Sequence, residues 1–399
     1  MTELIALRAT AVTVAMALLH VNSVPQNLGA SGNKWPYRFI LSDHSDMAAL
    51  DFDPTRSSLA LQAAAGAPLH IPWSSSPIRL GTGFDSAAIG SSEGPWKSSY
   101  PFSVPPHVPQ LLCEIDESIA SYKDGLSASA GSTSEHLSAS LAVTVGCDFL
   151  SASVTGDYDK AVLENRNATR ASRTSTVRSG RIIFNATPSL KHAAKATATG
   201  DAGLSEVRCQ YGDYYLAGLC LGADAGASVS ANNSQSSKFE QKKITATVSA
   251  FLWSRSVTHT SASQEFEASM DLEFSGYATL NGQKFHQRCG LGSTNPMKSP
   301  ATALAATQRA ADVQSMHAAA AEYMQKVANL HKDVQVRMDA LGLHHQKLLA
   351  LEDCSKICQA GLVVQLVLVP FSLLRELVEI SSTKKCLAGT TKITEMRMQ

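Results

Sequence analysis

The sequence predicts an α+β protein in which a central antiparallel sheet is followed by a helical C-terminal region. Between residues 137 and 275, apolar side chains alternate with polar ones in several separate runs, which is the two-residue period of half-buried strands. From residue 301 onward the apolar residues recur every three or four positions, which is the period of a helix. Strands grouped in one part of a chain and helices in another favour an α+β fold.

The amino-acid composition narrows the classes of protein to which this chain can belong. The chain has 399 residues, of which 44% are hydrophobic, so it can form a substantial core. Lys plus Arg and Asp plus Glu both number 34, so no global field favours nucleic acid or an anionic membrane. We therefore expect no nucleic-acid partner, and any membrane binding must come from a local surface.

Cysteine and histidine spacing gives no sign of a metal or catalytic site. The eight cysteines are too sparse in a chain of this length for a disulfide scaffold. Cys354 and Cys358 are four residues apart, but no second Cys or His pair stands at zinc-site spacing. The twelve His are scattered, and no acid and base are placed as a catalytic pair. We expect no metal, no cofactor and no catalytic residues, so the protein is not expected to be an enzyme.

Residues 1–76 are predicted to form an irregular N-terminal extension, with a candidate signal segment. An apolar run at 9–19 favours a signal, whereas Glu3 and the lack of a basic start argue against one, so both alternatives stay open. Neither this run nor 361–374 reaches the ~20 apolar residues of a spanning helix, so no constitutive transmembrane anchor is expected. Secretion is favoured, with the protein soluble before it binds a membrane.

The main domain is predicted to cover residues 77–380, with the central sheet at 137–280, helices at 301–380 and a loose tail at 381–399. It opens on Leu80-Gly81-Thr82-Gly83-Phe84-Asp85, where the change of pattern indicates the start of a domain. A phosphate-binding loop is excluded here because Ser86 stands at the third glycine position and no helical pattern follows. Residues 108–126 predict a short helix, with four apolar residues on one face: Leu111, Leu112, Ile115 and Ile119.

The strands of the sheet are predicted from alternation alone. Residues 137–145 alternate, and after Gly146-Cys147-Asp148 the phase flips, which indicates a turn or bulge before the next apolar run at 150–154. Further alternating runs cover 227–231, 244–252 and 266–274. Between them, residues 156–205 and 232–243 lose the period and gain charge, which predicts two polar inserts.

The stretch from Tyr211 to Gly226 predicts a turn, a buried central strand and a glycine-containing bend. It opens with Tyr211-Gly212, continues through Tyr214 and Tyr215 into an apolar run, and closes on spaced glycines.

This stretch resembles the signature of membrane attack complex/perforin (MACPF) domains, in which an aromatic-Gly-Thr-His-aromatic run leads into a central strand. Tyr211, Gly212 and Tyr215 match the aromatic, glycine and final aromatic positions. Asp213 and Tyr214 stand where the family usually has Thr and His, and Gly222-Ala223 stands where it has two glycines. The order of strand, insert, signature strand, insert and strand also matches the family.

The resemblance implies a bent, twisted central sheet with helical inserts and a self-associating protein that acts on membranes. It implies that Gly222 and Gly226 are hinges, because glycine tolerates a changing bend, and that Val at either position blocks lysis without unfolding. It also implies that the inserts unfurl into membrane hairpins, with candidate membrane-insert residues at Asp157, Ile182, Ile183, Phe184 and Phe239. Five arginines crowd residues 156–205, so a solvated charged insert is the alternative there.

The C-terminal region is predicted to be helical. A stripe of apolar residues from Val313 to Val334 predicts a helix of about 40 residues that ends near Gly342, packed on its own domain in preference to a partner chain. Residues 354–380 predict two short helices separated at Pro370.

The predicted function is therefore that of a MACPF-like protein whose partners are a lipid membrane and further copies of itself, assembling towards a β-barrel pore. A non-lytic binding or scaffold protein on the same fold is the alternative. An unrelated enzyme whose sheet mimics the pattern is a third interpretation.

Overall fold

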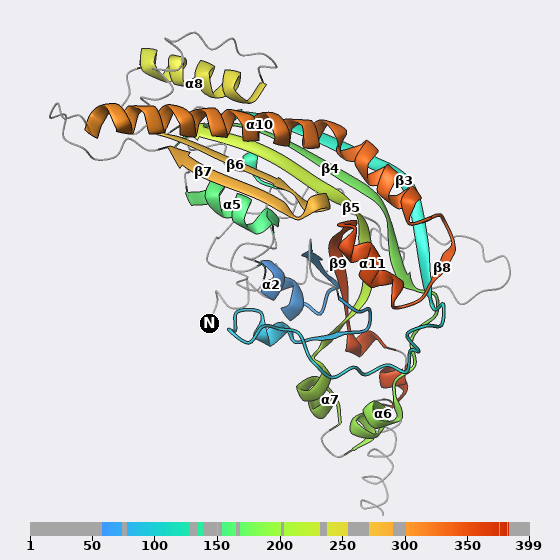
Figure 1. Cartoon of the computed structure of the whole chain (residues 1–399). Helices are drawn as coiled ribbons and strands as arrows, with labels where there is room; N and C mark the ends of the chain where they lie inside the picture. Colours follow the sequence, from blue (N-terminus) through green and yellow to red (C-terminus); the bar gives the residue numbers. More distant parts are fainter. Residues whose placement is uncertain are drawn as a thin grey trace, which may run out of the picture.

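The computed structural model describes residues 58–73, 78–127, 135–138, 150, 154–164, 168–200, 203–231, 238–253, 271–289, 301–374, 376–380 and 382. Within these ranges the molecule is built around one sheet with helices on both faces (Figure 1). Most of the predicted strands at 137–145 and 266–274, the candidate signal segment and nearly all of the tail lie outside them.

In the part of the chain that the structure describes, the sheet has nine strands, and all their pairings are antiparallel. Its main path runs β1-β9-β5-β4-β3-β8, with β2 and β6 also paired to β5 and β7 paired to β6. The strands are β1 (Leu69–Pro72), β2 (Gly83–Phe84), β3 (Leu111–Ser127), β4 (Thr169–Phe184), β5 (Tyr214–Ala231), β6 (Leu272–Ala278), β7 (Gln283–Cys289), β8 (Lys347–Leu349) and β9 (Val363–Pro370).

Helices connect and cover these strands. Within the described residues they are α2 (Ser58–Ala64), α5 (Val154–Glu164), α6 (His192–Thr199), α7 (Leu204–Tyr211), α8 (Lys238–Trp253), α10 (Ala301–Ala340) and α11 (Asp353–Gln359). Short 3-10 turns are η2 (Ser86–Ala88), η4 (Thr279–Asn281) and η5 (Phe371–Leu373), and residues 376–380 are also helical. Among the described helices, none combines the length and apolar character needed to cross a membrane.

Strand β5 is the centre of the fold, as the signature stretch predicted. All 18 of its residues are buried. One side pairs with β4 along most of its length, while the other side pairs with β9 from Tyr214 to Leu221 and with β6 from Ala225 to Ala231. The exchange of partners falls between these two stretches, where the long strands curve (Figure 1).

The long helix confirms the C-terminal prediction in its length and in its packing. α10 has 40 residues and packs against β4, β5, β6 and β7. The predicted stripe is buried against the protein's own sheet: Val313, Met316, Ala320, Tyr323, Val327, Leu330 and Val334. α8 packs on the same face beside α10, whereas α5 lies on the opposite face of the sheet (Figure 1).

The helix predicted at 108–126 is wrong, because this segment is strand β3. Two of its acidic residues stand directly opposite arginines of β4, and both pairs are ion pairs: Glu114 with Arg181 at 2.6 Å and Asp124 with Arg173 at 2.5 Å. Opposite charges in facing positions stabilise an antiparallel pair. Pairing with a strand some 50 residues away thus overrides the local helical pattern of four apolar residues.

The strand predicted at 244–252 is also wrong, because these residues belong to helix α8. Its buried residues Ile244, Val248, Phe251 and Leu252 are spaced by four, three and one, which places them on one helical face. The apolar residues of this segment therefore fit both a two-residue period and a helical period. The segment is a helix because its helical apolar face packs against α10 and the sheet.

Three further predictions are corrected by strand pairing or packing. Residues 363–370 form strand β9 between β1 and β5, instead of the first of two helices, because a run that is apolar on both faces also suits a fully buried strand. Residues 58–72, expected to be irregular, contain α2 and β1. Val154, expected at the end of a strand, begins α5.

Candidate functional site

The signature turn joins helix α7 to strand β5. Tyr211 is the last residue of α7, and Gly212 follows with φ +87° and its N–H bonded to the carbonyl of Arg208 at 2.9 Å. A Cβ on Gly212 would lie 2.2 Å from the carbonyl oxygen of Phe84, so only glycine fits beside β2. β2 then pairs with the first two residues of β5. The predicted turn and buried strand are both present.

The residue that departs most from the family signature holds the turn in place. Asp213 accepts hydrogen bonds from the backbone N–H of Ser86 at 2.8 Å and from its hydroxyl at 2.5 Å, and it lies 3.4 Å from the guanidinium of Arg208. Its carbonyl accepts from the N–H of Phe371. Asp213 thus ties the signature to the start of the domain and to the end of β9.

The two signature tyrosines of β5 are packing residues. The hydroxyl of Tyr214 donates to the carbonyl of Ala67 at 3.0 Å, and burial raises the pKa of Tyr214 to about 12. The ring of Tyr215 packs 5.1 Å from that of Phe102 and 5.2 Å from that of Phe371. Both side chains therefore anchor β5 in the core.

The bend is built from irregularities at one level of three neighbouring strands. The register shifts between Ile115 and Ile119 in β3 and between Arg178 and Gly180 in β4. Gly222 of β5 has φ +152°, and a Cβ there would lie 2.0 Å from the carbonyl oxygen of Val177. β-bulges bend a strand and increase its local twist. Gly222 therefore lies at the bend of the sheet, and its role as a hinge stays a prediction.

Gly226, the second predicted hinge, lies in a stretch of β5 that keeps a regular register with β4. Its backbone lies under the ring of Tyr277, and a Cβ would stand 2.4 Å from that ring. Tyr277 in turn packs 4.7 Å from Tyr158 of α5. Gly226 thus admits an aromatic side chain against the sheet. We expect Val at Gly222 or Gly226 to clash in the folded state, which corrects the expectation that it would act without unfolding.

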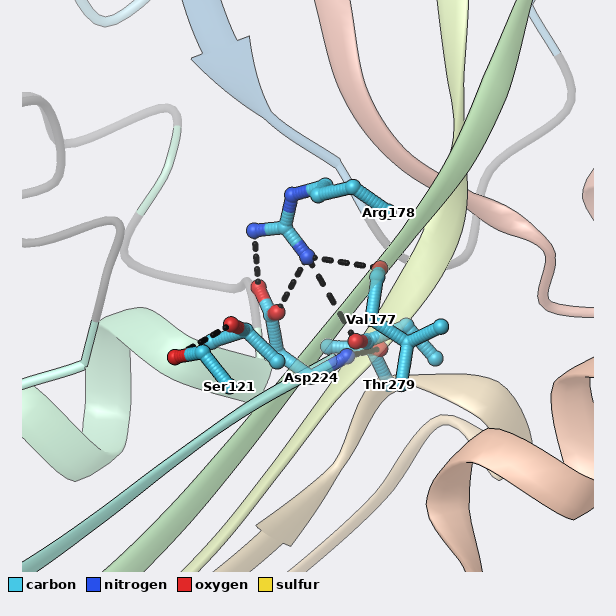
Figure 2. Close-up of polar contacts among 7 residues, drawn as sticks. Ser121, Val177, Arg178, Asp224 and Thr279 are labelled. Carbon is cyan, nitrogen blue, oxygen red and sulfur yellow. Dashed lines mark hydrogen bonds and ion pairs between the residues drawn. The ribbon is translucent and has the colours of Figure 1, made fainter. Parts of the chain in front are cut away.

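A buried ion pair spans β4 and β5 at the bend (Figure 2). Two nitrogens of Arg178 lie 2.5 and 3.1 Å from the carboxylate oxygens of Asp224, and Arg178 also donates to the carbonyl of Val177 at 3.0 Å. The N–H of Asp224 donates to the hydroxyl of Thr279 in η4 at 2.8 Å. Burial lowers the pKa of Arg178, whereas Asp224 raises it, and the net direction is upward. The pair links the bend to the β6–β7 turn.

The two faces of β5 differ in chemistry beyond the bend. Asp224, Gly226 and Ser228 alternate with Ala223 and a run of further alanines and valine on the opposite face. The polar residues lie on the side covered by α5, because Gly226 faces Tyr277 and Tyr277 contacts α5. A half-apolar, half-polar strand is common at a sheet surface, yet here both faces are buried.

Helix α5 and the short segment before it cover this polar face with a buried hydrogen-bonded cluster. The carboxylate of Asp159 accepts from the N–H and hydroxyl of Ser138 at 2.7 and 2.5 Å, and the hydroxyl of Tyr158 donates to the carbonyl of His136 at 3.0 Å. Arg170 of β4 donates to the carbonyl of Val162 at 2.9 Å. The scattered polar residues of the sequence gave no signal for this cluster.

Helix α8 covers the other face through aromatic contacts. The ring of Phe251 stacks on that of His317 in α10, with ring centres 3.8 Å apart, and it lies 6.4 Å from Phe274 of β6. α5 and α8 therefore cover opposite faces of the sheet, and each belongs to a connection between two adjacent strands, β3 and β4 for α5 and β5 and β6 for α8.

The structure separates the candidate membrane-insert residues. Asp157 lies in α5 and forms an ion pair with Lys284 of β7. Ile182, Ile183 and Phe184 belong to β4 in the sheet, with Ile182 and Phe184 buried, so they are not part of an insert. Phe239 lies in α8. The helical connection between β3 and β4 falls at 128–168 instead of 156–205, because β4 occupies the centre of the predicted insert.

The described cysteines Cys113, Cys209, Cys220, Cys289, Cys354 and Cys358 are free thiols. Burial raises the pKa of Cys113 and of Cys220 to about 11 in each case. In the described part of the chain, no group of His, Cys, Asp and Glu residues is arranged to hold a metal ion.

Comparison with known proteins gives matches among solved structures only. No protein-family model and no curated protein matches the sequence. Similar structures include GNIP1Aa from Chromobacterium piscinae, 13% identical over 70% of this chain with a TM-score of 0.24. They also include the cytotoxin suilysin from Streptococcus suis, 6% identical over 77% with a TM-score of 0.31. A putative cell invasion protein with a MAC/Perforin domain from Bacteroides thetaiotaomicron is 11% identical over 55%, with a TM-score of 0.21.

This chain spans between 53 and 60% of the length of those three structures. Identities and TM-scores as low as these carry no argument about activity. The molecule itself defines its class: it has an α+β fold, in which a bent antiparallel sheet carries helical connections on both faces and a long C-terminal helix.

Proposed function

We propose that this protein acts on membranes by self-assembly, with its two helical connections converting into β-hairpins of a barrel pore. Residues 128–168 join β3 to β4, and residues 232–271 join β5 to β6. Ser127 pairs with Arg170, Thr169 with Ala231 and Ala231 with Leu272, so both connections leave the sheet at the same end. Each has about 40 residues, enough for two membrane strands of ~9–11 residues and a turn.

The observation that carries the proposal is the double period of α8. In the folded protein residues 244–252 are helical, yet apolar side chains also alternate with neighbours over the same residues. Ala246 and Ala250 are on the apolar side of that alternation, although both are exposed on α8. A strand in a membrane barrel needs this two-residue period, whereas a helix packed on a sheet does not.

Self-assembly follows from backbone chemistry. A hairpin in a bilayer must pair every N–H and C=O, so only a closed barrel is stable there. Among the described strands, β8 pairs with the outer side of β3 only at 111–113, and β7 pairs with β6 alone. The outer sides of β3 and β7 are therefore the edges at which further copies would add strands.

The first test is dye release from liposomes, with electron microscopy of the same membranes. Release together with ring- or arc-shaped particles supports pore formation. Binding without release supports the alternative, a non-lytic binding or scaffold protein on the same fold, and contradicts the proposed pore.

A matched pair of variants tests the hairpin directly. Ala246→Asp places a charge on the lipid side of the proposed strand, where a charged side chain destabilises a membrane barrel. Thr247→Asp, one residue later, places the same charge on the polar side. We expect both variants to fold as the natural protein does, Ala246→Asp to lose dye release and Thr247→Asp to keep it. Equal release from the two variants would contradict the hairpin.

A further inference from the structure

A buried imidazole ties the connection between β3 and β4 to the sheet. His136 has 0% of its surface exposed, and its Nε2 and Nδ1 lie 2.6 Å from the hydroxyl of Ser127 and 2.8 Å from that of Ser172. Ser127 ends β3 and Ser172 lies near the start of β4, so the ring bridges two neighbouring strands. Gly125 makes room for it, since a Cβ there would lie 3.0 Å from the ring.

The charges around this ring are unfavourable to a further positive charge. Burial, then Arg170 and then Lys123 lower the pKa of His136 to about 4. The carboxylate of Asp159 on α5 accepts two hydrogen bonds from Ser138. The titratable and charged groups on the surrounding elements are Lys123 of β3, Arg170 of β4, Tyr158 and Asp159 of α5, Glu273 of β6, and Glu135 beside the histidine itself.

We propose that His136 is an acid-operated latch, whose protonation releases residues 135–138 and α5 from the polar face of the sheet. A neutral imidazole can donate to one serine hydroxyl and accept from the other, whereas an imidazolium can only donate. Protonation therefore removes one acceptor of the bridge and adds a buried cation beside two others. The latch rests on the proposed function only for its biological role, because the released helix α5 lies in one of the two connections that are proposed to become hairpins. The release itself does not depend on pore formation.

The direction and size of the pH effect follow from the lowered pKa of His136. A released imidazole takes up its proton near pH 6.5, while in place it does so near pH 4, so the latched form loses stability as the pH falls through this window. Between pH 7.4 and 5.0 the ratio of released to latched molecules rises about 25-fold. Above pH 7 the ratio is nearly constant.

Hydrogen exchange on the full chain tests the latch without a membrane. Protection factors, which correct for the intrinsic pH dependence of exchange, are measured at pH 7.4 and 5.0 for the amides of 154–164. We expect a fall of about 25-fold in the natural protein and no such fall in His136→Gln, whose amide is neutral at both pH values. His107→Gln removes an exposed histidine and is expected to behave as the natural protein does.

A second variant covers the case in which His136→Gln does not fold. Lys123→Gln removes one of the two cations from an exposed position and is expected to reduce the fall. Two results would overturn the latch. One is that protection does not fall in the natural protein. The other is that protection falls equally in the natural protein and in a folded variant, either His136→Gln or Lys123→Gln. Dye release measured at both pH values separates the two proposals: acid-dependent exchange without any release contradicts the pore and leaves the latch standing.

Discussion

The carboxylate of Asp224 is held by the guanidinium of Arg178 across strands β5 and β4, at 2.5 and 3.1 Å (Figure 2). In the register of the sheet Asp224 faces Thr176, and Arg178 faces Gly222, so the pair is diagonal and crosses the level of the bend. Only 1% of the Asp224 side chain and 15% of the Arg178 side chain are exposed. The bend therefore contains a desolvated ion pair whose two charges depend on each other.

We expect Asp224→Ala to lower the free energy of unfolding by about 3–5 kcal/mol, because it leaves the Arg178 charge buried without its partner. Removing both charges with Arg178→Met and Asp224→Leu should recover most of this loss. Denaturant unfolding of the natural protein, of Asp224→Ala and of the double variant measures these differences in free energy. Arg173→Gln breaks an exposed pair with Asp124 and serves as the control, at about 0–1 kcal/mol. A loss of unfolding free energy in Asp224→Ala no larger than that in Arg173→Gln would contradict the mutual dependence of the two buried charges.

Gly222→Ala should also destabilise the fold, by more than about 2 kcal/mol, because φ +152° disfavours a side chain and the added carbon meets a backbone carbonyl. Gly90→Ala is the control, since a Cβ there meets nothing within 4 Å. Thermal unfolding followed by circular dichroism measures both. An unchanged midpoint in Gly222→Ala would mean that the strand can shift its bulge.

The β6–β7 turn is clamped by the last turn of α10. Arg337 donates to the carbonyls of Leu280 at 2.6 Å and of Ala360 at 2.5 Å, and to the side chain of Asn281. We expect Arg337→Met to lower the free energy of unfolding by about 1–3 kcal/mol, since two carbonyls lose a charged donor. Lys332→Met, on an exposed position of α10, should stay within about 0.5 kcal/mol. Urea titration distinguishes the two outcomes.

Thiol reactivity reports the burial of the cysteines. At pH 8, Cys209 is exposed and should react with iodoacetamide in the native protein. Cys113 and Cys220 are buried and have pKa values raised to about 11, so their thiolates form only at much higher pH and we expect no labelling until the chain unfolds. Peptide mapping by mass spectrometry assigns each label. Native labelling of Cys220 would show that β5 opens.

The long helix and the central strand could be predicted because each depends on a local signal that no neighbour contradicts. The apolar stripe of α10 has one helical period over many turns, and Gly342 lies just beyond its end. The signature from Tyr211 to Gly226 combines a glycine turn with a continuous apolar run. Both features survive in the structure because burial supports the same period that the residues display.

The errors fall where the sequence supports two answers. β3 has helical spacing of four apolar residues, but its acidic residues stand opposite arginines that lie far along the chain. β9 is apolar on both faces, which a buried helix and a buried strand share. The candidate site was only partly predictable: Gly222 carried a signal, whereas Arg178, Asp224 and His136 are brought together by strand register, which no local pattern contains.

By itself the sequence determined the class of fold, the central strand and the long helix, because periods of two and of three to four residues fix which side chains share a face. Only the tertiary structure decided which charges are buried at the bend and which face each helix covers. Residues 244–252 show the reason most directly. They fit a strand and a helix equally well, and the surface offered by α10 and the sheet makes them a helix.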